Sequence, residues 1–195
     1  MNIDKETIDI LSKDKFPKCD EYNLNINNMI DNLNIKVCNK RFNPHTNINN
    51  IHEMYDTMDD IQEWKTELGK IYHEALKYKE MSELIEATIN GMYLDAEKKM
   101  LISDELKKAV TDKSFKNIDE KKAWINEQIN KEADINDIIN KSSKHLIKAS
   151  SKLKMIDNIS NVIEGQEDKY SRKISLLHEE IQLGLLKTDD PKGTI

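Results

Sequence analysis

The chain has 195 residues, enough for one ordinary domain, but only 37% of them are hydrophobic and 6% aromatic, whereas 34% are charged. This balance excludes a thick layered core and is typical of long solvated helices that carry one apolar stripe. The formal net charge of −6 argues against attraction of the whole protein to nucleic acid or to an anionic membrane. No apolar run approaches the roughly 18 residues that a membrane helix needs.

The beginning of the chain has no apolar run with basic flanks, so it does not resemble a signal peptide. Cys19 and Cys38 are interpreted as free thiols in a reducing compartment, with a disulfide as the alternative. Frequent Asn, Ile and Lys are typical of AT-rich genomes, such as those of low-GC bacteria or their phages. We therefore expect a cytoplasmic protein, or a virion protein if a phage encodes it.

Residues 1–50 are expected to form short helices and a loop. Apolar spacing predicts one helix that stops near Phe16-Pro17 and a second between about Asp20 and Leu33. Turn-forming residues then predict a loop that ends at residue 50. We expect this segment to dock at the base of a helical hairpin formed by residues 51–184.

The first arm of that hairpin is a long proline-free helix from Ile51 to about Thr111, with a break near Ile102-Ser103. Its apolar positions alternate steps of three and four, which is the pattern of a coiled-coil seam. These positions are Ile61, Trp64, Leu68, Ile71, Ala75, Tyr78, Ser82, Ile85, Ile89, Met92 and Ala96.

The second arm follows a turn near 112–117. Asn117 is predicted to cap its first turn and Gly184 to end it, and residues 185–195 are expected to be a flexible tail. The same alternation recurs at Ile135, Ile139, Ser142, Leu146, Ala149, Leu153, Ile156, Ser160, Ile163, Glu167, Tyr170, Ile174, Leu177 and Ile181.

The two seams are complementary if facing residue numbers sum to about 228. In this register large residues oppose small ones, and Lys141–Lys154 lies beside acidic residues of the first arm between Glu74 and Glu86. A parallel dimer through each seam is the rival arrangement, but it would stack identical residues. We therefore predict an all-α protein, a long antiparallel coiled-coil hairpin with a short N-terminal helical segment.

No recognised catalytic or cofactor motif occurs in the chain. Zinc-protease and di-iron spacings are absent around the histidines, which are expected to be solvated on the surface. The five glycines form no phosphate-binding loop, and no serine or cysteine stands in a nucleophile motif. The expectation is a protein that is no enzyme and needs no metal or cofactor.

The basic run from Lys141 to Lys154 is the strongest candidate for a binding site. Lys141, Lys144, Lys148 and Lys152 share one helix face and are suited to phosphates. Pairing with the acidic face of the first arm is the preferred interpretation, and the run lacks aromatic residues for stacking on bases.

We expect a non-enzymatic interaction or assembly protein, oligomeric through apolar helix faces or bound to a protein partner, with no membrane contact. Apolar residues outside the seams, such as Leu84, Leu176 and Leu183, indicate a second surface that another helix covers. One alternative is a recombination-mediator-like factor that binds single-stranded DNA through Lys141–Lys154. Another is an inhibitor whose acidic residues near the start of the first arm mimic nucleic acid.

Overall fold

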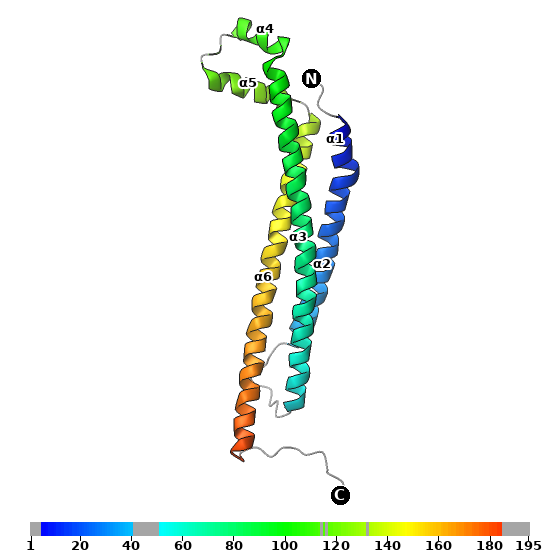
Figure 1. The fold of residues 1–195 in the computed structure, drawn as a ribbon, viewed down its shortest axis with the longest axis vertical. Helices are drawn as coiled ribbons and strands as arrows, with labels where there is room; N and C mark the ends of the chain where they lie inside the picture. Colours follow the sequence, from blue (N-terminus) through cyan, green and yellow to red (C-terminus); the bar gives the residue numbers. More distant parts are fainter. Residues whose placement is uncertain (1–4, 41–50, 114, 116, 132, 185–195) are drawn as a thin grey trace. The chain divides into compact units, whose positions relative to one another are not determined.

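The computed structural model describes residues 5–40, 51–113, 115, 117–131 and 133–184, and the regular elements among them are helical. Long helices α3 and α6 pack antiparallel and α2 packs with them, so the predicted all-α hairpin is confirmed. Residues 41–50, the expected loop, and 185–195, the expected tail, lie outside the described residues. The order is α1 (Lys5–Ile10), π-helix η1 (Leu11–Lys15), α2 (Phe16–Asn39), α3 (Ile51–Leu101), α4 (Asp104–Lys113), α5 (Ile118–Asn130) and α6 (Ala133–Gln182) (Figure 1).

The chain divides into two compact units. Unit 1 comprises Met1–Asn25 and Glu74–Lys152, and unit 2 comprises Ile26–His73 and Leu153–Ile195. Each unit contains one segment of the N-terminal helices, one of α3 and one of α6 (Figure 1). Each core therefore contains a segment of the N-terminal helices beside α3 and α6, where a simple hairpin would have only its two arms.

The N-terminal segment is one continuous helical run, whereas the sequence predicted an interruption at Phe16-Pro17. The π-helical turn η1 ends directly before Phe16, whose N–H donates to the carbonyl of Leu11, five residues back. This wider turn accommodates the Pro17 ring, which in a regular helix interior would clash with the carbonyl four residues earlier. The buried side chains of the run are Leu11, Phe16, Cys19, Ile26, Ile30, Leu33 and Val37.

The ends of the helices follow the predicted capping residues. The Leu106 N–H donates to Ser103 Oγ over 3.1 Å at the start of α4, and the Glu120 N–H donates to Asn117 Oδ1 over 2.8 Å at the start of α5. Gly184 has a φ of 69°, a left-handed conformation that suits glycine after the end of α6. These contacts confirm the break after Leu101, the Asn117 cap and the end at Gly184.

The connection between the arms contains two packed short helices, α4 and α5, and α6 begins only at Ala133. The expected second arm, continuous from Asn117, is therefore interrupted after Asn130. The reason is visible in the core of unit 1, where α4 and α5 bury apolar side chains against the ends of α3 and α6. This cluster consists of Ala96, Met100, Leu106, Ile125, Ile129 and Ile135.

The seam of α3 is buried as the alternation predicts, from Ile61 to Ala96, with Met92 partly exposed. On α6 only every second predicted position is fully buried, namely Ile135, Ser142, Ala149, Ile156, Ile163, Tyr170 and Leu177. The intervening positions Ile139, Leu146, Leu153, Ser160, Glu167, Ile174 and Ile181 are partly exposed. Instead α6 buries Ile138, His145, Ile159 and Gln166. Packing of a third helix broadens and shifts the buried face of α6 in this way.

Candidate functional site

A buried polar cluster centred on His145 of α6 lies in unit 1. The expectation that every histidine is solvated is wrong here, because His145 is only 3% exposed. Its Nδ1 lies 3.0 Å from the hydroxyl of Tyr78 on α3, and its ring stacks on Phe16 of α2 with centroids 5.6 Å apart. The side chain therefore joins the three helices of unit 1. No histidine spacing motif marks this role; the signal is a polar residue three positions after buried Ser142 and four before buried Ala149.

Nearby charged groups shift the pKa of His145 in opposite directions. Burial lowers the pKa of its imidazole, a carboxylate oxygen of Asp20 at 3.7 Å from Nε2 opposes this, and Lys148 and Lys141 reinforce it. Burial also raises the pKa of the Tyr78 phenol. In the neutral imidazole with its proton on Nε2, the Nε2–H faces Asp20. The unprotonated Nδ1 then accepts a hydrogen bond from the Tyr78 hydroxyl. The arrangement is a satisfied polar contact in the core, and both rings are buried.

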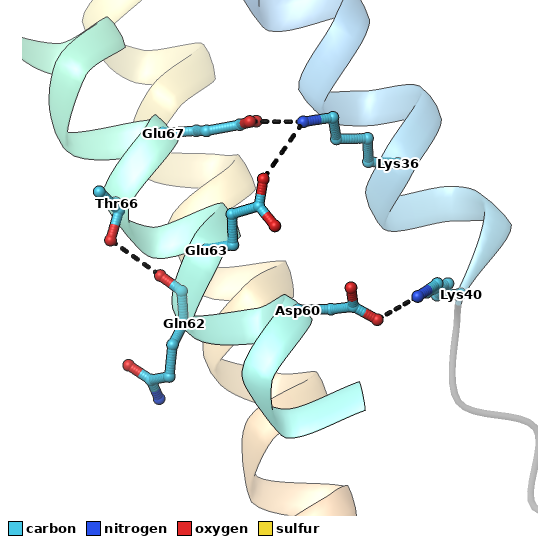
Figure 2. Close-up of polar contacts among 7 residues, drawn as sticks. All are labelled: Lys36, Lys40, Asp60, Gln62, Glu63, Thr66 and Glu67. Carbon is cyan, nitrogen blue, oxygen red and sulfur yellow. Dashed lines mark hydrogen bonds and ion pairs between the residues drawn. The ribbon is translucent and has the colours of Figure 1, made fainter. Parts of the chain in front are cut away.

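Acidic side chains near the start of α3 pair with a lysine of α2 and with Lys40, which directly follows that helix, in unit 2 (Figure 2). Lys36 lies between Glu67 and Glu63, and Lys40 contacts Asp60. The same carboxylates were the candidate nucleic-acid mimic, and Lys36 and Lys40 neutralise part of their charge.

One cross-hairpin ion pair does form in unit 2. Glu167 of α6 accepts hydrogen bonds from Lys65 and, over 2.9 Å, from Gln62 of α3. Lys65 lowers the pKa of the Glu167 carboxyl. The pair Gln62–Glu167 in unit 2 lies within one residue of the register in which facing numbers sum to about 228, whereas Tyr78–His145 in unit 1 is displaced from that register by five residues.

Within the described residues, two lysines of the predicted basic face do not form the ion pairs that were expected with the first arm. Lys141 lies over the ring of Phe16, with Nζ 5.0 Å from the ring centroid. Lys144 and Lys148 are exposed and form no ion pair within the described part of the chain. Glu74 and Glu83, two of their expected partners, pair along α3 with Lys77 and Lys79. Lys152 is partly exposed and has a polar interaction of its own.

A groove of about 250 Å³ lies between α2 and α6 in unit 2. Its walls are mostly apolar and amide side chains, and Val162 on its rim is 51% exposed. Gln166 is 4% exposed, and its Nε2 donates to the carbonyl of Val37 over 3.5 Å. Its Oε1 is buried without a hydrogen-bond partner among the described residues. The lining residues are Asn34, Val37, Cys38, Asn158, Ile159, Val162 and Gln166.

Exposed apolar side chains continue along α6 beside this groove. Met155, Val162 and Leu176 are exposed at multiples of seven residues, and Leu183 follows directly after the helix. Residues seven apart lie on the same stripe of an α-helix, so these side chains form one apolar line in unit 2, which exposed Lys169 interrupts between Val162 and Leu176. Only Leu176 and Leu183 were singled out from the sequence. Met155 and Val162 were not singled out from the sequence, because each directly precedes a seam residue, Ile156 or Ile163.

The described residues contain neither a metal-binding cluster nor a membrane-spanning helix. No group of three or more His, Cys, Asp or Glu side chains among them is arranged to hold a metal ion. None of the described helices combines the length and apolar character that a bilayer crossing needs. Cys19 is buried and Cys38 exposed, and both are free thiols.

Comparison of the chain with protein-family models, with curated proteins and with solved structures finds no match.

Proposed function

We propose that this chain is a non-enzymatic helical interaction protein that binds other helices, including those of its own copies, through the exposed face of α6 in unit 2. The apolar line of Met155, Val162 and Leu176 beside the groove carries the proposal. An exposed apolar stripe next to a groove that holds an unsatisfied amide is typical of a surface that an amphipathic helix covers.

The experiment compares the wild-type chain with Val162→Glu. Val162 is half exposed, so a carboxylate there is compatible with folding but not with an apolar partner. The matched control is Leu84→Glu on α3, whose side chain is 56% exposed and does not line the groove. Immobilised proteins are used for capture from a lysate of the source cells, and light scattering gives the mass in solution. Loss of self-association or of a captured protein in Val162→Glu alone supports the proposal. A monomer with the same captured proteins for all three chains overturns it.

A second candidate function is binding of single-stranded nucleic acid through α6 in unit 1. The observation that favours it is the exposure of Lys144 and Lys148 without ion pairs in the described chain. Phosphate contacts by these side chains predict salt-dependent binding, which Lys144→Glu combined with Lys148→Glu abolishes. Fluorescence anisotropy with a labelled oligonucleotide measures this. Absence of binding at low salt rules the candidate out.

A further inference from the structure

We infer that unit 1 binds a linear polyamine in a pocket between α3 and α6. The pocket has a volume of about 260 Å³ and its residues all belong to unit 1, whereas the proposed function uses a face of unit 2. Its lining includes Glu86, Ile89, Asn90, Tyr93, Ile139 and Ser143. A pocket with an apolar wall and a few polar groups is typical of a site for a small ligand that has both apolar and polar parts.

Two polar groups of this pocket, a carboxylate and a phenol, are available to a ligand. Glu86 is partly buried and forms no ion pair with a described residue, and the Tyr93 hydroxyl forms no hydrogen bond with one. Burial raises the pKa of the Tyr93 phenol and the charge of Glu97 reinforces this shift, so the phenol stays neutral and can accept or donate a hydrogen bond. Together these groups favour a ligand that carries hydrogen-bond donors and a positive charge.

A second carboxylate extends the negative charge along α3. Glu97 lies eleven residues, about three turns, after Glu86, so the two side chains share one side of the helix. Glu97 is close enough to Tyr93 to shift its pKa, and it forms no ion pair with a described residue. The Cα atoms of Glu86 and Glu97 are roughly 16 Å apart along the helix axis, with Tyr93 between them. This spacing suits a chain with ammonium groups along its length rather than a compact cation.

The lysines of the basic face of α6 are directed away from this pocket. Successive residues of an α-helix are rotated by about 100°, so Lys144 and Lys148 lie about 140° and 180° round α6 from Ile139, which lines the pocket. On α3, Lys79 pairs with Glu83 over 3.5 Å. The carboxylate in the pocket therefore remains available to a cation from solution.

The ligand class follows from these groups. Ammonium groups form charge-assisted hydrogen bonds with the two carboxylates, and a methylene chain packs on Ile89 and Ile139. The Tyr93 ring adds attraction for a cation. Spermidine, which carries three ammonium groups on a flexible chain, is the probe of this class. Its control is 1,8-octanediol, which has the same number of chain atoms but no charge.

The experiment is isothermal titration calorimetry of spermidine and of octanediol into the full chain at low salt. Glu86→Gln keeps the size of the side chain but removes its charge, and we expect it to weaken spermidine binding about tenfold. The matched control is Glu80→Gln, which changes the charge equally at an exposed position of α3 that does not line the pocket. Glutamine is a good helix former, so circular dichroism is expected to show unchanged helix content in both variants.

Saturable binding of one spermidine per chain supports the inference if octanediol does not bind, Glu86→Gln weakens the binding and Glu80→Gln retains it. Absence of saturable binding to the wild-type chain overturns it. Equal weakening by the two variants also overturns it, because that result indicates diffuse attraction to the acidic surface. Neither result bears on the α6 face of unit 2, which the comparison with Val162→Glu tests separately.

Discussion

The Nδ1 atom of His145 lies 3.0 Å from the hydroxyl oxygen of Tyr78, and this contact joins α6 to α3 inside the core of unit 1. The two positions are displaced by five residues from the register that the sequence predicts for the hairpin. Neither ring is accessible enough to serve a substrate, with Tyr78 fully buried. The contact therefore specifies how the helices align, and its removal has a measurable cost.

Tyr78→Phe removes the hydroxyl and leaves the buried His145 nitrogen without its partner. We expect the free energy of unfolding to fall by about 1–2 kcal/mol, because an unsatisfied buried polar atom keeps its desolvation cost. Urea denaturation measures this. The control is Tyr55→Phe, where an exposed hydroxyl lies 3.4 Å from His178 and the expected change is below about 0.5 kcal/mol. Equal losses for the two variants would contradict the account.

The stability of unit 1 is expected to depend on pH through His145. Its pKa is lowered from the usual 6.5, so the unfolded chain binds a proton at a higher pH than the folded chain does. The contribution is fully present above pH 6.5 and is lost as the pH falls from that value through the folded-state pKa. Asp20 opposes the effect, whereas Lys141 and Lys148 reinforce it. Tyr78 stays neutral throughout this range.

Urea midpoints at pH 8, 6 and 5 test this dependence. His145→Gln keeps a polar side chain but removes the titration, so its stability is expected to fall less over this interval than that of the wild type. An identical pH slope in both proteins would refute the role of His145.

Ser103→Ala tests the start of α4. The Ser103 hydroxyl accepts the Leu106 N–H and donates to the carbonyl of Met100 over 2.8 Å, so it links the end of α3 to α4. Its loss is expected to cost about 1 kcal/mol in urea denaturation. Ser151→Ala, at an exposed position inside α6, is the comparison and is expected to stabilise slightly because alanine has the higher helix propensity. A neutral Ser103→Ala would argue against the cap.

The hairpin register in unit 2 is testable by cross-linking. Gln62→Cys combined with Glu167→Cys, in a chain with Cys19→Ala and Cys38→Ser, places two thiols where the native side chains are 2.9 Å apart. A short bismaleimide is expected to join them within one chain in dilute solution. The control pairs Gln62→Cys with Lys154→Cys, displaced roughly 20 Å along α6. Equal yields for both pairs would show that the register is wrong.

The two native cysteines are expected to react at different rates. Burial raises the pKa of the Cys19 thiol, which reduces its reactive thiolate, whereas Cys38 is exposed at the groove. Alkylation followed by peptide mass spectrometry is expected to label Cys38 first and Cys19 only on denaturation. Rapid labelling of Cys19 in the native chain would contradict the packing of α2 in unit 1.

The hairpin was predictable because the apolar repeat and the capping residues that specify it are local features of the sequence. The α3 seam from Ile61 to Ala96 repeats every three or four residues, and capping residues such as Asn117 mark the helix ends. The continuous N-terminal helix was not predictable in this way. Pro17 argues for a stop in any regular helix, and the π-helical turn that accommodates it has no clear sequence signature.

The candidate site was predictable only in part. A seam pattern assumes one partner helix, so it assigns Glu167 to the interior and leaves His145 and Gln166 outside it. The third helix reverses these assignments, because α2 covers a side of α6 that a two-helix hairpin leaves open. The salt bridges of Lys36 and Lys40 follow from the same packing. Local periodicity does not determine which distant helix packs against α6.

Disulfide trapping at Val162 tests the proposed self-pairing of α6 most directly. The chain carries Val162→Cys with Cys19→Ala and Cys38→Ser, and the same background with Leu84→Cys is the control. If α6 pairs with α6 of a second copy through this face, mild oxidation at a concentration that favours association converts most of the Val162→Cys chains to a covalent dimer, and the control stays largely monomeric. A yield of covalent dimer no higher than that of the control would contradict the account.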